Sequence, residues 1–126
     1  VVGVNVSGEK IGGNVAGAIV LFPDPMGATG GSIVRAADMY AKLGGAPAAK
    51  MIAMHLIVTP EYLKRVRQEL PNMTVYAVRL DRGLSPAEVF RCELGHKWDE
   101  ERGLNERQYI VPGAGGLGEI LNNSYV

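Results

Sequence analysis

Three short apolar runs alternate along this chain with two segments of helical spacing, and this alternation limits the folds open to it. The runs cover residues 18–22, 51–58 and 74–78, and continuous apolar runs of this length are typical of strands buried in a parallel sheet. Between them, apolar residues recur at helical intervals. They are Ile33, Ala36, Ala37 and Tyr40, and then Leu63, Val66 and Leu70. The order predicts an α/β fold, a Rossmann-like parallel sheet with flanking helices.

Length and charge exclude several classes of protein. The 126 residues fit a single domain, 1–126. The formal net charge is zero, with no basic run longer than two residues, so we expect no nucleic-acid partner. No apolar stretch approaches the ~20 residues that span a bilayer, so we expect no membrane association. A single cysteine, Cys92, excludes an internal disulfide and fits a reducing compartment, so we expect a cytoplasmic location.

The segment Asp24-Pro25-Met26-Gly27-Ala28-Thr29-Gly30-Gly31-Ser32 joins the first strand to the first helix. A helix N-terminus presents unpaired amide groups that favour an anion. Glycines let the backbone approach a phosphate closely, and hydroxyl groups add donors. The carboxylate of Asp24 can accept hydrogen bonds from ribose hydroxyls or lie near a magnesium ion. The segment therefore indicates a site for a phosphorylated sugar.

This segment resembles the phosphoribosyl pyrophosphate loop of the uracil phosphoribosyltransferases, which reads Asp-Pro-Met-Leu-Ala-Thr-Gly-Gly-Ser. Only Gly27 departs, where the family usually has a larger apolar residue. Downstream, Leu104-Asn105-Glu106 and Tyr109-Ile110-Val111-Pro112-Gly113 resemble the segment that forms the family's uracil pocket. The resemblance implies the type I phosphoribosyltransferase fold, incomplete at the N-terminus, and we expect the chain to be the C-terminal part of a longer polypeptide or a processed or trimmed one.

The resemblance also implies a reaction, the joining of uracil to phosphoribosyl pyrophosphate to give uridine monophosphate (UMP) and pyrophosphate. Asp24 is then the catalytic residue, and magnesium accompanies the phosphoribosyl pyrophosphate without a metal site of the protein's own. The expected phosphoribosyl-binding residues are Asp24, Pro25, Met26, Gly27, Ala28, Thr29, Gly30, Gly31 and Ser32. The expected partners are these small molecules and further copies of the chain, since the family is oligomeric. The apolar opening, Val1 to Val6, would suit a subunit contact.

The resemblance places the uracil pocket near the end of the chain. The expected base-binding residues are Tyr109, Ile110, Gly115, Gly116 and Leu117. Backbone carbonyl and amide groups suit uracil, whose edge offers alternating carbonyl and N–H groups. Gly116 departs from the family, which has an aspartate there.

The same tail formally spells GxGxxG from Gly113 to Gly118, the dinucleotide-binding pattern. That pattern needs a following helix, a strand and an acid about 20 residues on, and only eight residues remain. A dinucleotide site is therefore excluded.

Residues 82–103 interrupt the resemblance as an inserted helix-loop, a candidate lid or subunit contact. Ser85-Pro86-Ala87-Glu88 combines an N-cap, a first-turn proline and a capping-box glutamate, which predicts a helix to about Leu94-Gly95 with Val89, Phe90 and Leu94 inward. The remaining residues, 96–102, are expected as an exposed loop, with Asp99-Glu100-Glu101 as a solvated face.

Two alternative functions stay open. No arginine precedes Asp24, and Lys10 is the sole basic residue before it, whereas the family holds pyrophosphate with upstream arginines. Together with Gly116 and the inserted segment, this also fits a catalytically degenerate relative that binds a nucleotide or sugar phosphate in a regulatory or structural role. The other alternative is an enzyme of the same fold that acts on a different base.

Three further patterns favour structural roles. His55 lies inside an apolar strand, which indicates a core histidine with its hydrogen bonds satisfied. Cys92 and His96 are one helical turn apart, but two ligands do not make a metal site. Glu61 and Arg65 are spaced as an i,i+4 ion pair on the solvated face of the second helix.

Overall fold

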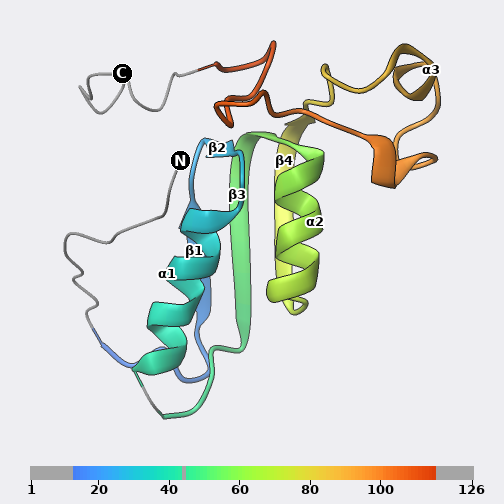
Figure 1. Ribbon diagram of the computed structural model, residues 1–126. Coiled ribbons are helices and arrows are strands. Elements are labelled where there is room, and N and C mark those ends of the chain that lie inside the picture. The colour runs from blue at the N-terminus through green and yellow to red at the C-terminus, as the bar shows by residue number, and fades with distance from the viewer. Residues whose placement is uncertain (1–12, 44, 116–126) are drawn as a thin grey trace.

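The computed structural model describes residues 13–43 and 45–115 and shows a parallel sheet with two long helices (Figure 1). The strands are β1 (Ile19–Pro23), β2 (Met26–Gly27), β3 (Lys50–Val58) and β4 (Met73–Leu80). The helices are α1 (Gly31–Lys42), α2 (Pro60–Glu69), the short α3 (Ala87–Phe90) and the 3-10 turn η1 (Trp98–Glu100). The predicted α/β fold is confirmed, and the three long strands and two helices lie where the sequence places them.

Strand β3 is the centre of the sheet, and all its pairings are parallel. Strand β4 pairs along the length of β3, from Met51↔Met73 to Val58↔Leu80. Strands β1 and β2 pair with successive parts of β3, at its residues 50–54 and 57–58. They are therefore one strand interrupted at Asp24 and Pro25, and this interruption lies at the carboxyl end of the sheet.

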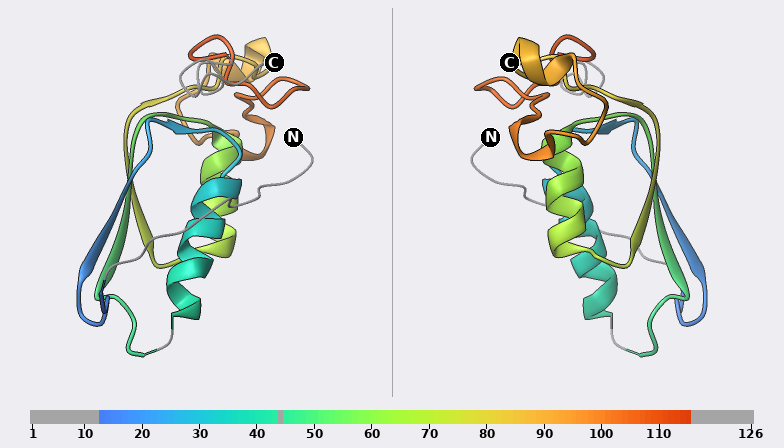
Figure 2. Two further views of the ribbon diagram at one scale, coloured as in Figure 1. Left: turned by 90° about the vertical axis from the view of Figure 1, so that its left-hand side faces the viewer. Right: turned by 90° about the vertical axis from the view of Figure 1, so that its right-hand side faces the viewer.

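Helices α1 and α2 lie on the same face of the sheet (Figure 2). The buried core between them contains Ile33 from α1, Ala53 and Val58 from β3, and Tyr62 and Val66 from α2. Thr59 begins α2 as predicted, since its side chain accepts a hydrogen bond from the N–H of Tyr62 at 3.0 Å and Pro60 follows it.

Apolar side chains on the other face of the sheet are uncovered in the part of the chain that the structure describes. They are Ile19, Leu21, Met54, Leu56, Tyr76 and Val78, with exposed fractions from 46% to 83%. The prediction of continuously buried strands is therefore wrong for this face. The reason is that the apolar runs continue on both sides of the sheet, while both described long helices pack on one side.

The segment 82–103 differs from its prediction. Helix α3 has only four residues, and the hydroxyl of Ser85 bonds the backbone of Arg102 instead of capping it, accepting from the N–H at 2.9 Å. Val89 is buried, but Phe90 and Leu94 are 53% and 61% exposed. The segment is thus held by contacts with its own far end rather than by helix formation.

Glu101 is fully buried, so its predicted place on a solvated face is wrong. Its Oε1 accepts a hydrogen bond from Arg82 Nη1 at 3.0 Å and another from the N–H of Gly95 at 2.9 Å. Arg82 also donates to the carbonyls of Val89, Phe90 and Cys92. One buried ion pair therefore ties both ends of the segment together, a long-range contact that no local pattern encodes.

Candidate active site

The loop that joins β1 to α1 lies at the carboxyl end of the sheet, where open α/β sheets bind their ligands. Gly30 begins α1 with a φ of 76°, a left-handed conformation that favours glycine. No side chain of residues 13–43 or 45–115 caps this helix, and its first turn contains no acidic residue. The N-terminus of α1 is therefore open to an anion.

The carbonyl groups of this loop point toward β3 and the start of α2. The carbonyl of Pro25 accepts from the N–H groups of Leu56 and Ile57 at 3.0 and 3.1 Å. Thr59 satisfies two further carbonyls, since its N–H donates to that of Gly27 at 3.1 Å and its hydroxyl to that of Ala28 at 2.6 Å. These three carbonyls are therefore bound within the protein rather than available to a ligand.

The donors of the loop are largely unused within the described residues. The N–H groups of Thr29, Gly30 and Ser32 make no hydrogen bond there, and that of Gly31 reaches only Thr29 Oγ1, at 3.3 Å. Beside them is a hollow of about 70 Å³, which exceeds the space of one water molecule. It is lined by Asp24, Met26, Gly27, Ala28, Thr29, Gly30, Gly31, Ser32, Ile33 and Tyr62. The structure thus brings the sequence-predicted phosphoribosyl-binding residues together around one hollow, except Pro25, which does not line it.

Asp24 is held at the end of β1 by both its backbone and its side chain. Its N–H donates to the carbonyl of Met54 at 3.0 Å, and its Oδ1 accepts from the N–H of Met26 at 3.0 Å. No described residue donates to its second carboxylate oxygen. That oxygen is available for ligand hydroxyls or a cation.

His55 lies behind Asp24 and is almost fully buried, as the sequence predicts. Its Nδ1 is 2.6 Å from the carbonyl oxygen of Asp24, and its Nε2 is 2.6 Å from the hydroxyl of Tyr62. Burial lowers the pKa of His55, against the opposing effect of the Asp24 hydrogen bond, and burial raises the pKa of Tyr62 above its usual range. Sequence patterns did not indicate Tyr62, because its ring reaches the hollow from a helix.

The downstream segment forms a compact loop closed by two antiparallel bridges, Leu104↔Ile110 and Ile110↔Gly115. The side chain of Asn105 accepts from the N–H groups of Arg107 and Tyr109, both at 3.0 Å. Ile110 is buried, and Tyr109 is half-buried. Of the predicted base-binding residues, Tyr109, Ile110 and Gly115 therefore share one loop, while Gly116 and Leu117 lie outside the described residues.

The carboxylate of Glu61 ties the start of this downstream loop to α2, and the carboxylate of Asp81 lies beside the loop. Glu61 of α2 accepts from the N–H of Gly103 at 3.0 Å and from that of Leu104 at 3.3 Å. The predicted Glu61–Arg65 pair is therefore wrong, and Arg65 instead pairs with Glu69 at 2.7 Å. Asp81, buried at the end of β4, accepts from Gly83 at 2.9 Å, and a Cβ at Gly113 would collide with its other oxygen.

Thr59 connects the two loops. Its hydroxyl bonds Ala28 in the first loop, and its methyl group lies against Gly103, where an added Cβ would be 3.1 Å away. Both loops therefore meet at the carboxyl ends of β3 and β4, and the warm-coloured downstream loop lies above these strand ends in Figure 1.

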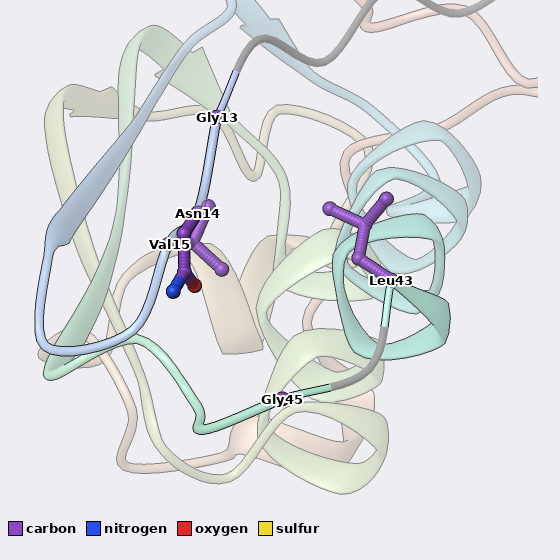
Figure 3. Close-up of a pocket in the computed structure, with 5 residues that line it drawn as sticks. All are labelled: Gly13, Asn14, Val15, Leu43 and Gly45. Atoms are coloured by element: carbon purple, nitrogen blue, oxygen red, sulfur yellow. The ribbon is translucent and has the colours of Figure 1, made fainter.

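Two other hollows in the described part of the chain lie away from this loop, and one of them, of about 620 Å³, is lined mainly by apolar residues together with Lys50 and Glu69. The hollow in Figure 3, of about 370 Å³, is lined among the described residues by Gly13, Asn14, Val15, Leu43 and Gly45, none of which is titratable. These residues precede β1 or follow α1, at the opposite end of the sheet from the loop. No group of three or more His, Cys, Asp or Glu residues with metal-binding placement occurs within residues 13–43 and 45–115. Over the same residues, none of the helices has the length and apolar character to cross a membrane.

Comparison with known proteins identifies the family. The model of the family described as "Uracil phosphoribosyltransferase" matches residues 6–96, which include the whole of Asp24–Ser32 but end before Leu104. The solved structure described as "Structure of AQ2163 protein from Aquifex aeolicus" is similar, with 30% identity and a TM-score of 0.62. The match covers 85% of this chain but only 40% of that one. The chain belongs to the uracil phosphoribosyltransferase family.

Proposed function

We propose that this chain carries the site that transfers a phosphoribosyl group from phosphoribosyl pyrophosphate to uracil, giving UMP and pyrophosphate. The observation that best supports the proposal is the arrangement of the loop before α1. Its carbonyls are bound by β3 and Thr59, and its N–H groups surround a hollow beside the carboxylate of Asp24. This combination suits a phosphate joined to a sugar.

In this proposal the two loops bind opposite ends of one nucleotide. The N–H groups of Thr29 to Ser32 bind the 5′-phosphate, and the free oxygen of Asp24 accepts from the ribose hydroxyls or from water bound to magnesium. The main chain of Ile110 and Gly115 meets the edge of uracil, and Tyr109 walls the pocket. Holding both reactants in one geometry supplies much of the rate enhancement.

The chemistry exchanges one bond at the anomeric carbon. The bond from that carbon to a pyrophosphate oxygen breaks, its electron pair leaves with pyrophosphate, and a bond forms to N1 of uracil, which loses its proton. Charge develops on the ribose ring and on the leaving group, so fixed dipoles and charges nearby lower the barrier. The carboxylate of Asp24, which lines the same hollow as the loop's N–H groups, would stabilise positive charge on the ribose.

The residues present fit a magnesium ion that arrives with the substrate. Among the described residues Asp24 is the single carboxylate that lines the hollow, and one of its oxygens has no described donor. Magnesium typically takes one or two carboxylates and completes its shell with phosphate oxygens and water. Bound in this way with Asp24, the ion would neutralise negative charge on pyrophosphate.

The remaining partners and the location follow the same proposal. The substrates are small molecules, the protein acts as a homo-oligomer, and it resides in the cytoplasm. Each of these is a proposal for the whole protein, because the chain spans well under half the length of the solved structure it matches.

The test is uracil-dependent release of pyrophosphate from phosphoribosyl pyrophosphate and magnesium by the full-length protein. We expect turnover that falls at least about a hundredfold in Asp24→Asn, since one transition-state electrostatic contact contributes on that order. Asp38→Asn is the matched control, because Asp38 lies on the exposed side of α1 and contacts Lys42. Folded protein that binds ribose 5-phosphate but turns over no base would support the degenerate binding relative instead. Turnover with another base and not with uracil would support an enzyme of the same fold that acts on that base.

A further inference from the structure

Position 27 has no room for a side chain. A Cβ built on Gly27 would lie 2.8 Å from Val58 Cγ1 and 2.9 and 3.0 Å from two ring carbons of Tyr62. Tyr62 is 1% exposed and belongs to the core, so its ring cannot swing away into solvent. The ring of Tyr62 thus fills the space beside the loop that a residue at position 27 would otherwise occupy.

The same ring carries a hydroxyl group that reaches His55. The oxygen lies 2.6 Å from Nε2, and the two rings meet edge to face with centroids 4.7 Å apart. The opposite nitrogen, Nδ1, lies 2.6 Å from the carbonyl oxygen of Asp24. A carbonyl only accepts, so Nδ1 carries the proton, and Nε2 of the neutral ring accepts from the hydroxyl of Tyr62. We call this chain of two hydrogen bonds the Tyr62–His55 link.

The carbonyl of Asp24 is met by a side chain, whereas the carbonyl of the next residue is met by the backbone. The carbonyl of Pro25 is satisfied by backbone N–H groups of β3. The carbonyl of Asp24, at the point where β1 ends, is met by the His55 ring. The link therefore fixes the peptide group that follows the Asp24 side chain.

We propose that Tyr62 and His55 are positioning residues for the phosphoribosyl site, which hold Asp24 and the loop in the ligand-binding conformation from helix α2. The inference rests on the proposed function, because it assigns these residues to the same site. Gly27 is part of the arrangement, since its missing side chain makes room for Tyr62.

The test compares binding of ribose 5-phosphate, by calorimetry, in the full-length protein and its variants. Tyr62→Phe keeps the ring and removes the hydroxyl, so we expect the Kd to rise about fivefold. His55→Leu leaves the Asp24 carbonyl without a donor, so we expect a rise of about tenfold or more. His55→Asn offers an amide donor near the position of Nδ1 and should recover most of the affinity.

Matched controls come from the surface. Tyr76→Phe removes a hydroxyl from the exposed face of the sheet, and His96→Leu removes the second of the two histidines. Both should bind ribose 5-phosphate like the unaltered protein. If Tyr62→Phe and His55→Leu also bind unchanged, the positioning role is wrong while the proposed function stands. If the unaltered protein binds no ribose 5-phosphate, both are wrong.

Two readouts separate positioning from general packing. The nitrogen NMR shifts of His55 should report the tautomer protonated at Nδ1, and ribose 5-phosphate should move them, whereas those of His96 should stay. In the enzyme assay, His55→Leu should raise KM for phosphoribosyl pyrophosphate with little change in KM for uracil. An Nε2-protonated ring, or equal effects on both KM values, would contradict the Tyr62–His55 link as a positioning device.

The space at position 27 gives a second variant that does not depend on the hydroxyl. Gly27→Ala should raise the Kd about tenfold when Tyr62 is present, because the new methyl group meets the ring. On top of Tyr62→Leu the same change should cost less than it does alone, because the clash with the ring is gone while the one with Val58 Cγ1 remains. Equal costs in the two backgrounds would overturn the assignment of Gly27 to this arrangement.

Discussion

The side-chain hydroxyl of Thr59 donates a hydrogen bond to the main-chain carbonyl of Ala28, with 2.6 Å between the oxygens. The same hydroxyl accepts from the N–H of Tyr62 and so caps helix α2. Thr59 is fully buried, and neither bond can be replaced by water without rearrangement. One hydroxyl therefore couples the start of a helix to the loop that surrounds the candidate phosphate site.

Thr59→Val should destabilise the protein by about 2 kcal/mol, because it removes a helix cap and leaves the Ala28 carbonyl without its donor. Valine has nearly the same side-chain shape as threonine, so the loss of stability measures the hydroxyl group rather than a cavity. Urea unfolding of the two proteins measures it. Thr59→Ser is the control that keeps the hydroxyl, and it should lose about 1 kcal/mol or less for its missing methyl group. A larger loss in Thr59→Ser than in Thr59→Val would contradict the coupling.

Glu61→Gln should loosen the downstream loop, because the carboxylate of Glu61 binds the N–H groups of Gly103 and Leu104. Hydrogen bonds to a charged acceptor are worth about 2 kcal/mol, so the amides of these two residues should exchange with solvent faster by about tenfold or more. In the enzyme assay, KM for uracil should rise while KM for phosphoribosyl pyrophosphate changes little.

Glu69→Gln is the matched control, since Glu69 lies on the same helix and pairs with Arg65 at the surface. It should leave the exchange of Gly103 and Leu104 unchanged. Unchanged exchange in Glu61→Gln would show that other contacts hold the loop.

Breaking the buried pair of Arg82 and Glu101 should destabilise the protein strongly. Glu101→Gln removes the charge opposite Arg82, whose side chain is only 12% exposed, and leaves that charge uncompensated. The expected loss in urea unfolding is about 3 kcal/mol. Glu100→Gln, one residue earlier and exposed, should change stability by less than about 0.5 kcal/mol. Equal small losses in both variants would mean that the pair does not hold the 82–103 segment.

The pH dependence of stability should carry a contribution from His55. Burial lowers its pKa in the folded protein, while the unfolded value is about 6.5. The fold thus prefers the neutral ring. Above about pH 6.5 the neutral ring of His55 makes its full contribution to the free energy of unfolding. This contribution is lost as the pH falls from there through the lower pKa of the folded protein.

Urea unfolding at about pH 7.5 and about pH 5.5 tests this contribution. The unaltered protein should lose more stability between the two values than His55→Asn, which cannot titrate. His96→Asn should lose as much as the unaltered protein, because His96 is exposed. A loss in His55→Asn as large as in the unaltered protein would exclude His55 as the source.

Much of the fold could be predicted because its signals are local. The apolar runs and the helical spacing of Ile33, Ala37 and Val66 each lie within one element, and the first two helices and three long strands follow from them. The loop before α1 was found for the same reason, since Asp24 to Ser32 are contiguous. The uncovered face of the sheet could not be predicted, because an apolar run does not indicate which side of the strand another element covers.

The other contacts that the sequence did not predict are pairings between distant residues. Glu61 lies 42 positions from Gly103, and its local spacing favoured Arg65 instead. Glu101 stands in an acidic run that is typical of a solvated surface, and only the fold brings Arg82 to it. Tyr62 carried no signal of its own, because its contact with the Asp24 loop exists only once α2 packs on the sheet.

The most direct test of the central claim is a crystal structure of the full-length protein with UMP. The phosphate should lie within about 3 Å of the N–H groups of Thr29 to Ser32, and the ribose should contact Asp24. The uracil ring should meet the main chain of Ile110 and Gly115. UMP bound with its phosphate elsewhere, for example in the hollow beside Leu43 and Gly45, would contradict the account.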